Sequence, residues 1–262
     1  MSTLVVVKVS GRPVDDPGAC AGLWSALASA AEQARLVVVH GGGVAVDRRL
    51  AQLGLVSERR DGLRVTPDEH IGVVTGVLAG EVNRRLVGVL SAAGVDAVGI
   101  GVSDAGLCAC EPIAGLGRVG RVAGGDGRVI AALHGAGIVP VVHSIGADAD
   151  GGELNVNADD AAAGVAAAAS ADRLVLLTDV AGVLDADGNT IDELDAARVD
   201  GLIASGVIAG GMCPKARAAL GAGEACGAEV VIGSWHDAAA LIGGAEGTGT
   251  RVRRRRPIGA AG

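Results

Sequence analysis

The sequence predicts an α/β fold built around a mainly parallel central sheet. Two observations carry this prediction: short runs rich in Val, Leu and Ile alternate with Ala- and Leu-rich segments of helical periodicity, and glycine-rich turns join them. Most of the apolar runs show no polar alternation, as expected of strands that are covered on both faces. We expect strands at residues 4–9, 36–39, 95–100, 138–143, 174–178 and 230–232.

Two amphipathic helices are expected between the first strands. Apolar residues recur at helical spacing in both of them. In the first helix these residues are Leu23, Leu27, Ala30 and Ala34. A similar pattern runs from residue 71 to residue 90, with Asp68 and Pro67 placed where a helix begins.

The remaining organisation follows from composition along the chain. Residues 105–129 are rich in glycine and predict hairpins and loops, an insertion of a kind that often covers a site. No linker or repeat interrupts the sequence, so we expect two lobes within one sheet, residues 1–150 and 151–262. The boundary is expected near residues 148–153.

Bulk composition bounds the function. Half of the 262 residues are apolar, but the chain contains no Phe or Tyr and only two Trp. Proteins that stack single-stranded nucleic acid rely on aromatic faces, and a net charge of −8 repels a phosphate backbone. A window of about 18 uncharged apolar residues is also lacking. We therefore expect no nucleic-acid partner, no membrane partner and a cytoplasmic location.

The chain also contains scattered cysteines and a basic tail. The five cysteines are scattered without CxxC spacing, so buried reduced thiols are expected instead of disulfides or a zinc site. Four consecutive arginines at residues 253–256 favour a solvated tail over a contact with an acidic partner.

A buried lysine is the first feature that predicts chemistry. Residues 5–11, VVVKVSG, form an apolar strand that brings Lys8 to its carboxyl end just before a turn. A lysine in such a strand needs a counter-charge, and open α/β sheets bind ligands beyond the carboxyl ends of their strands. A phosphate is one such counter-charge; a lysine that reaches solvent from the strand end is the alternative.

A triple glycine follows the second predicted strand. Residues 37–43, VVVHGGG, pass directly into a helix from Val44. Glycine lets backbone N–H groups approach an anion closely, and the helix N-terminus adds a favourable dipole. The segment is neither a Walker A loop nor a GxGxxG motif, so it predicts an anion site of another kind.

Two further segments carry polar side chains that suit an acidic substrate. Arg64 precedes a helix, and its guanidinium matches a carboxylate, with an ion pair to Asp61 as the alternative. Asn155 and Asn157 alternate along an extended segment and therefore share one face. Asp159 either caps the following helix or holds ammonium groups.

The last two motifs predict a nucleotide site. Residues 176–184, LLTDVAGVL, form a strand that exits into a glycine-containing turn, which suits adenine and ribose contacts. Residues 210–215, GGMCPK, open a helix that carries Lys215 in its first turns. The helix dipole disfavours a cation there unless an anion is bound. Two lysines in such places indicate a polyphosphate.

Taken in order, these motifs resemble a known family. The set KVSG, HGGG, DGLRVT, VLAGEVNRRLV, NVNAD, LLTDVAGVLD and GGMCPK is similar to that of the acetylglutamate kinases of the amino acid kinase superfamily. The resemblance runs from residue 4 to about residue 252. It implies the amino acid kinase fold, a three-layer αβα sandwich. It also implies MgATP-dependent phosphorylation of the side-chain carboxylate of N-acetyl-L-glutamate in arginine biosynthesis.

The resemblance also implies roles for the motif residues. Lys8 and Lys215 would stabilise the transferring phosphoryl group, Asp159 would orient both ammonium groups, and Gly11 would lie against the phosphates. Magnesium would be held by the nucleotide and water, with no metal-ligand cluster from the protein.

Substrate contacts are implied in the same way. The acyl amino acid would be held by Gly42, Gly43, Arg64 and Asn155, and Asn157 would help to bind the reacting groups. The nucleotide site would be lined by Thr178, Asp179, Val180, Ala181, Gly182, Val183, Val207, Ile208 and Ala209.

The resemblance leaves alternatives. Ser10 stands where the family usually has a second glycine, which narrows backbone access to the phosphates or requires a different turn. The nearest alternatives are a kinase of the same superfamily that acts on carrier-bound aminoadipate or glutamate, and a non-catalytic sensor of amino acids or nucleotides. The sequence begins directly at its first strand; within the family this implies an arginine-insensitive homodimer, with the helix at residues 69–90 at the interface.

Overall fold

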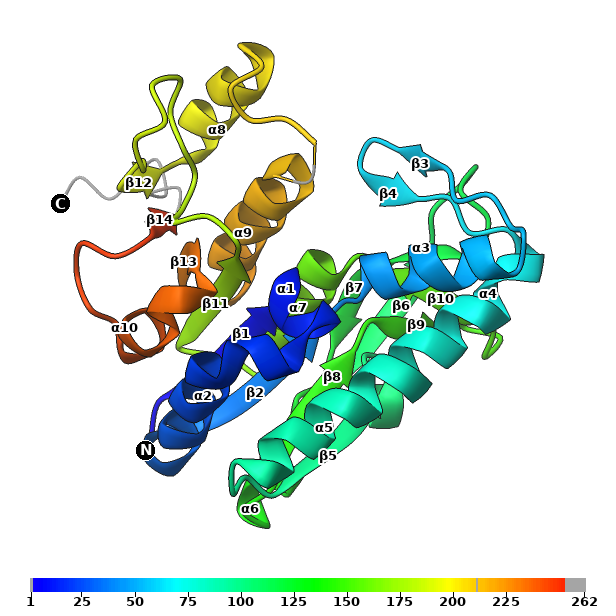
Figure 1. Ribbon diagram of the computed structural model, residues 1–262, viewed down its shortest axis with the longest axis horizontal. Helices are drawn as coiled ribbons and strands as arrows, with labels where there is room; N and C mark the ends of the chain where they lie inside the picture. Colours follow the sequence, from blue (N-terminus) through cyan, green and yellow to red (C-terminus); the bar gives the residue numbers. More distant parts are fainter. Residues whose placement is uncertain (1, 211, 253–262) are drawn as a thin grey trace, which may run out of the picture.

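A computed structural model describes residues 2–210 and 212–252, and all six predicted strands form (Figure 1). The arginine run at residues 253–256 lies outside the described residues. The strands of the main sheet are β1 (Leu4–Val9), β2 (Arg35–His40), β5 (Ala97–Gly101), β8 (Val139–His143), β11 (Arg173–Thr178), β12 (Glu193–Leu194), β13 (Glu229–Ser234) and β14 (Thr250–Val252).

This sheet is mainly parallel, as the apolar runs predict. Its strand order is β12-β14-β13-β11-β1-β2-β8-β5, and of the described strand pairs within this sheet only β13–β14 is antiparallel. β1 lies in the middle, with Lys8 opposite Leu176 of β11 and Val39 of β2. The carboxyl ends of the three strands that carry site motifs therefore meet at one edge of the sheet.

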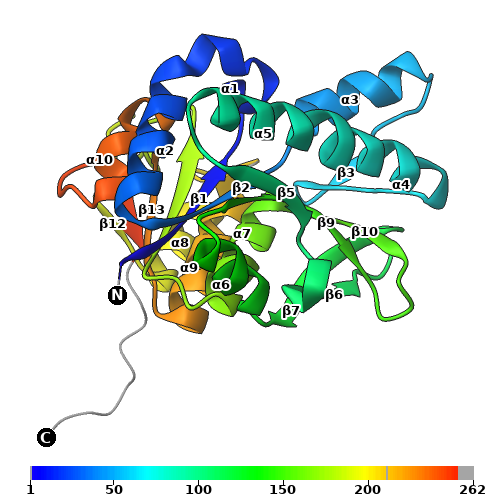
Figure 2. The same cartoon turned by 90° about the horizontal axis from the view of Figure 1, so that it is seen from below.

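Helices cover both faces of the sheet and make it the middle of three layers (Figure 2). On one face lie α2 (Ala21–Gln33), α5 (Asn83–Ala92) and α10 (Ala238–Gly243), and on the other lie α6 (Arg128–Gly135), α7 (Ala158–Ala168) and α9 (Met212–Cys226). Successive residues of β1 alternate between the two cores, Leu4 and Val6 in one and Val5 and Val7 in the other. The shorter helices are α1 (Arg12–Asp15), α3 (Gly43–Gln52), α4 (Asp68–Thr75) and α8 (Ala196–Ala204).

A smaller sheet and a hairpin flank the carboxyl edge of the main sheet. The smaller sheet has the order β6-β7-β10-β9, formed by Cys108–Pro112, Val119–Gly125, Glu153–Val156 and Ile145–Ala147. The hairpin joins β3 (Arg59–Arg60) to β4 (Leu63–Arg64). The glycine-rich insertion thus forms the β6–β7 hairpin, as predicted, and ends where α6 begins.

The longest helical element runs from α4 through a π-helical turn, Gly76–Val82, into α5. The backbone stays helical across both junctions, so residues 68–92 form one continuous helix. Neither this element nor any other helix of the described residues is long and apolar enough to cross a membrane.

Candidate active site

Two lysines and one aspartate meet at the carboxyl edge of the sheet. Lys8 Nζ lies 2.9 Å from Asp159 Oδ1, and Lys215 Nζ donates to the same oxygen at 2.8 Å. β1 supplies Lys8, α9 supplies Lys215 in its first turn, and α7 supplies Asp159. All three residues are at most 6% exposed. The counter-charge expected for a buried lysine is therefore this carboxylate.

The charges of this cluster depend on one another. Burial lowers the pKa of Lys8 to about 8, because desolvation outweighs the attraction of Asp159, and repulsion by Lys215 adds to the decrease. Burial alone raises the pKa of Asp159, but the two ammonium groups outweigh it and hold that pKa well below its ordinary value. Two positive charges on one negative charge leave a net positive centre, which suits a polyphosphate.

Asn157 fixes the start of the helix that presents Asp159. The Asn157 side chain accepts hydrogen bonds from the N–H groups of Asp159 and Asp160, at 2.9 and 3.3 Å, and so caps α7. Asp159 therefore does not cap the helix, one of the two roles left open from the sequence. Asn157 stands at the extended Ncap position, from which a short polar side chain reaches the backbone N–H groups of the first turn. Asp159 lies inside that turn, so its side chain is free to bind the lysines.

A cleft of about 310 Å³ opens in front of this cluster. It brings together most of the residues implied for catalysis and for the acyl amino acid. They are Lys8, Gly11, Gly42, Gly43, Arg64, Asn155, Asn157 and Asp159. The triple glycine contributes its backbone because α3 begins at Gly43, within one residue of the predicted helix start. The N-terminus of α3 therefore faces the same cleft as Lys8, whereas Lys215 reaches Asp159 from outside the lining of the cleft.

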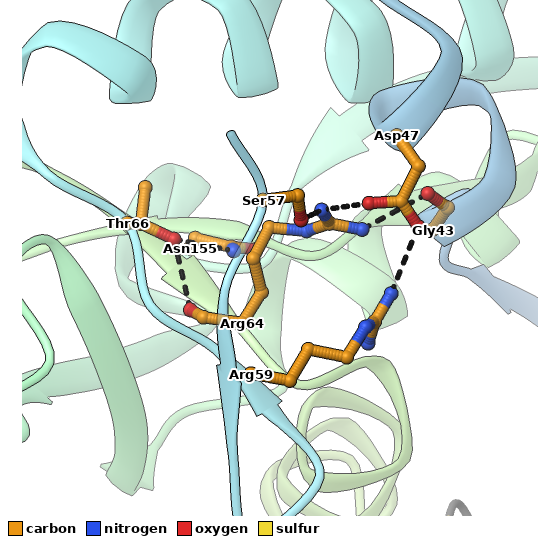
Figure 3. A network of polar contacts seen from close by, with 7 residues as sticks. All are labelled: Gly43, Asp47, Ser57, Arg59, Arg64, Thr66 and Asn155. Carbon is orange, nitrogen blue, oxygen red and sulfur yellow. Dashed lines mark hydrogen bonds and ion pairs between the residues drawn. The ribbon is translucent and has the colours of Figure 1, made fainter. Parts of the chain in front are cut away.

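Arg64 lies in a polar network behind the glycine loop (Figure 3). Its guanidinium contacts the Asp47 carboxylate and the Ser57 hydroxyl, and it donates to the Gly43 carbonyl at 2.9 Å. The side chain is only 7% exposed, so the expected alternative of a surface ion pair with Asp61 is wrong. Asp61 is close to Arg64 in the sequence, but the β3–β4 turn directs the Arg64 side chain inward, toward α3.

The same network ties the hairpin to α3 and to the smaller sheet. Arg59 donates to the other Asp47 oxygen at 3.1 Å, and these contacts hold the pKa of Asp47 at about 2 against the effect of burial, which alone raises it. Asn155 donates to the Thr66 hydroxyl at 3.0 Å, which in turn donates to the Arg64 carbonyl at 3.0 Å. One connected set of hydrogen bonds thus positions the polar wall of the cleft (Figure 3).

The residues implied for the nucleotide lie farther along the edge. Gly11 adopts φ +68°, and a side chain there would collide with the Asp179 carboxylate, which also accepts from Trp235 Nε1 at 3.0 Å. Ser10 donates its hydroxyl to the Leu177 carbonyl at 2.8 Å, so this departure from the family pattern anchors β1 to the end of β11. Residues 178–183 follow β11 and residues 207–209 precede α9; none of them lines the 310 Å³ cleft.

Four polar residues at the site were not assigned from the sequence. Asp47 and Ser57 bind Arg64, and His40 and Asn83 lie buried behind the glycine loop. His40 and Asn83 carried a signal, since each is a polar side chain within an apolar strand or apolar helical stripe. Asp47 and Ser57 gave none, because both look like ordinary surface residues. In the described part of the chain, no group of three His, Cys, Asp or Glu residues is arranged to hold a metal ion.

Comparison with known proteins assigns the family. Residues 3–234 match the family model described as the amino acid kinase family. An acetylglutamate kinase from Vibrio cholerae is 42% identical over 252 residues, covering 94% of this chain and 96% of the relative. One from Moritella profunda is 41% identical over 258 residues, covering 96% and 97%.

Solved structures agree on the fold. The crystal structure of smu.665 from Streptococcus mutans UA159 superposes with a TM-score of 0.82 at 29% identity, covering 96% of this chain and 99% of that one. The αβα architecture, the paired lysines and the near full-length matches give one assignment. The chain belongs to the amino acid kinase family and, within it, to the acetylglutamate kinases.

Proposed function

We propose that this protein uses ATP to phosphorylate the side-chain carboxylate of N-acetyl-L-glutamate, giving N-acetylglutamyl 5-phosphate for arginine biosynthesis. The observation that carries this proposal is the convergence of Lys8 and Lys215 on one oxygen of Asp159, beside a cleft lined by the glycine loop. A centre with two cations and one anion suits a phosphoryl group in transfer between two anions.

The chemistry needs charge stabilisation more than proton transfer. The attacking carboxylate is already ionised at neutral pH, so no general base is required. Lys8 and Lys215 offset the charge of the phosphoryl oxygens, and Asp159 holds both ammonium groups in place before ATP arrives. Mg²⁺ enters with ATP as part of the substrate and offsets further phosphate charge.

We assign the acyl amino acid to the wall of the cleft. The N–H groups of Gly42 and Gly43, at the N-terminus of α3, suit an oxygen of the reacting carboxylate. Arg64 suits the second carboxylate of the substrate, and Asn155 suits its amide. Asn157 lies beside Asp159 and contributes to binding at the reacting end.

The nucleotide belongs to the second lobe in this proposal. Gly11 suits the phosphates, because it lines the cleft together with Lys8 and lacks a side chain that would block them. The ribose and adenine then lie along residues 178–183 and 207–209, at the ends of β11 and before α9. Residues 1–150 would bind most of the acyl acid, contribute Gly11 to the phosphates and form the dimer. Residues 151–262 would bind the rest of ATP and contribute Asn155 and Asn157 to the acyl acid.

We further propose a cytoplasmic homodimer that contacts its partner through residues 69–90. The solvent side of this helix carries Gly72, Gly76 and Gly80 at every fourth position, and a Cβ on any of them would meet no neighbouring atom. Glycine destabilises a helix interior by about 1 kcal/mol relative to alanine. A row of glycines on an open helix face suits the close approach of a second helix.

The decisive experiment compares substrates side by side. ADP release is measured with N-acetylglutamate, glutamate and aminoadipate, each with MgATP. Turnover with N-acetylglutamate alone supports the proposal. Turnover only with the unacetylated acids would favour the related kinase of carrier-bound substrates. Lys8→Ala serves as the control: unchanged ADP release in that variant would point to a contaminating activity, and a silent wild type to a non-catalytic sensor.

A further inference from the structure

Two buried polar side chains behind the glycine loop have no role in the proposed function. His40 ends β2 and is fully buried, and Asn83 begins α5 and is 3% exposed. Asn83 Nδ2 lies 3.0 Å from His40 Nε2 and donates to the Val141 carbonyl at 2.8 Å. His40 Nδ1 lies 2.8 Å from the carbonyl oxygen of Gly41. The contacts run from the long helix through the imidazole to the first glycine of the loop.

These contacts determine which nitrogen of His40 carries the proton. The Asn83 amide nitrogen is a donor, so His40 Nε2 accepts from it. Nδ1 is then the protonated nitrogen and donates to the Gly41 carbonyl. Burial, opposed by the Gly41 contact and helped by His143 and Lys8, lowers the pKa of His40 to about 4. The imidazole is therefore neutral at physiological pH.

The bond to Gly41 sets the direction of the next N–H group. A trans peptide is planar, with its C=O and N–H pointing in opposite directions. Because His40 holds the Gly41 carbonyl toward the interior, the Gly42 N–H points away from His40, on the side where Gly42 lines the cleft. Within the described chain, the N–H groups of Gly42 and Gly43 donate to no protein acceptor.

Packing leaves Asn83 and the loop little freedom. A Cβ on Gly99 of β5 would lie 1.8 Å from Asn83 Oδ1, so the strand accepts the amide only because glycine stands there. The same long helix presses Leu78 and Val82 against Gly42, within 2.9 and 3.1 Å of where a Cβ would be. The helix therefore fixes both the imidazole and the glycine it orients.

We propose that His40 and Asn83 are positioning residues for the acyl amino acid: through the Gly41 carbonyl they turn the Gly42 N–H into the cleft, where it binds a substrate carboxylate oxygen. This inference rests on the proposed function, because it assumes that the glycine loop binds the acyl acid. It adds a hydrogen-bond chain through which a side chain on the helix at residues 68–92 determines affinity for that substrate.

Two variants of one residue separate the two hydrogen bonds. In His40→Asn, the side-chain amide lies at the Nδ1 position and still donates to Gly41, but it does not reach Asn83. In His40→Gln, the amide reaches Asn83 and no longer donates to Gly41. We expect His40→Gln to raise the KM for N-acetylglutamate about tenfold, the loss of roughly one hydrogen bond to an anion, with the KM for ATP unchanged. His40→Asn is expected to stay within about threefold of the wild type.

Equal losses in both variants, or a parallel rise in the KM for ATP, would show a merely structural role and overturn the inference. A second measurement covers the case in which a variant does not fold. In the ¹⁵N-histidine-labelled wild type, NMR should find His40 neutral with its proton on Nδ1. In uniformly ¹⁵N-labelled wild type, addition of N-acetylglutamate should shift the Gly42 and Gly43 amide signals. A proton on Nε2 instead would overturn the inference even if the enzyme is active.

The outcomes also separate this inference from the proposed function. A wild type without N-acetylglutamate turnover, but with the expected His40 tautomer, would refute the substrate and leave the loop geometry intact. Turnover in the wild type with both Gly42 and Gly43 amides unmoved by the substrate would refute the inference alone.

Discussion

Lys8 and Lys215 are the only lysines in the sequence, whereas arginine occurs throughout the chain. Arginine presents a flat fork of donors, whereas an ammonium group is a compact charge. Two ammonium groups can share a single Asp159 oxygen at 2.8 and 2.9 Å, a geometry that two guanidinium groups would not fit without separating. The chain thus retains lysine only where a point charge is needed.

The first prediction follows from this geometry. Lys8→Arg and Lys215→Arg should each lower kcat by about 100-fold or more, because the positive charge remains but moves away from the phosphoryl oxygens. Steady-state ADP release measures the effect, with circular dichroism to confirm folding. Arg121→Lys, at an exposed ion pair with Glu111, is the matched control and should leave kcat unchanged. Near-normal kcat in both lysine variants would contradict the proposed role.

The lowered pKa of Lys8 predicts a basic limit to activity. Burial places this pKa at about 8 despite Asp159, so the ammonium form is lost above that pH in the free enzyme. We expect kcat/KM for ATP to fall about tenfold per pH unit above this point, and kcat to persist to higher pH because bound phosphates favour the charged form. With only two lysines, ¹⁵N NMR of their side chains reads the titration directly.

A counter-variant and a stability effect test the same group. Asp159→Asn removes the contact that raises the Lys8 pKa, so the basic limit should move to lower pH. The pKa of Lys8 in the folded protein lies below its ordinary value of 10.5, so the unfolded chain binds more protons between the two pKa values. The Lys8 contribution to the free energy of unfolding should therefore increase from about pH 8 to pH 10.5. A basic limit unmoved in Asp159→Asn would assign that limit to another group.

Gly11 makes a separate prediction about the nucleotide side. Its φ of +68° costs a residue with a side chain roughly 1–2 kcal/mol, and an added Cβ would lie 2.3 Å from the Asp179 carboxylate. Gly11→Ala should lower Tm and raise the KM for ATP, with a smaller effect on the KM for the acyl acid. Gly18→Ala, with ordinary φ and no close neighbour nearer than 3.7 Å, is the control for both readouts. An unchanged KM for ATP would place the phosphates elsewhere.

At the scale of elements, the strands were predictable and the shape of the long helix was not. Strands such as β1 and β11 are continuous apolar runs, so composition alone identifies them. The long helix buries His70, Val74, Leu78, Val82, Leu86 and Leu90, which recur at every fourth residue. In a regular α-helix a step of four advances about 40° beyond a full turn, so five steps would carry this stripe about 200° around the helix.

The π-helical turn keeps that stripe on one side. Its i→i+5 hydrogen bonds reduce the rotation per residue, which offsets the drift and leaves Val82 against Gly42 and Asn83 against His40. Sequence periodicity cannot distinguish a π-helical turn from a slightly irregular α-helix, because the choice between them depends on how the helix packs against β5 and the glycine loop. The sequence therefore predicts the helix, but not the contact of Asn83 with His40.

The hairpin and α3 are joined through one carboxylate, which supports a further prediction. Asp47 of α3 binds Arg59 and Arg64, one from each hairpin strand. Asp47→Asn should loosen the hairpin and leave the buried Arg64 guanidinium without its carboxylate, raising the KM for N-acetylglutamate about tenfold. Isothermal titration of the acyl acid and of ATP measures both affinities, and ATP binding should not change.

Glu58→Gln provides the matched control for Asp47. Glu58 pairs with Arg60 at the exposed side of the same hairpin, so its loss should affect neither affinity. Equal effects of the two variants would mean that hairpin charge in general, and not the link to α3, determines affinity for the acyl acid.

At the scale of the whole molecule, the site is formed by residues that lie far apart in the sequence. Lys8, Asp159 and Lys215 are brought together because β1 lies in the middle of the sheet, between β2 and β11. The rule that parallel strands present ligand sites at their carboxyl ends predicts which residues face that edge. It does not predict strand order, because each apolar strand is compatible with several neighbours. Asp47 escaped prediction for the same reason: its partners are defined only after the hairpin folds over α3.

Subunit assembly is the last prediction at this scale. Gly72, Gly76 and Gly80 form an open stripe on the long helix, although each glycine costs helix stability. If a second copy packs there, Gly76→Arg should place a charge and a long side chain between two helices and convert the dimer to a monomer. Multi-angle light scattering reads the mass, and Gly22→Arg, at an equally open glycine of α2, is the control.

A milder substitution at the same stripe distinguishes an interface from an exposed surface. On a surface that stays open to solvent, Gly80→Ala should raise the free energy of unfolding by about 1 kcal/mol, because alanine is the better helix former. In a tight interface the added methyl group meets the partner helix, so the same change should weaken dimerisation and lower Tm at low protein concentration. A stabilised Gly80→Ala protein together with an intact Gly76→Arg dimer would move the interface away from residues 69–90.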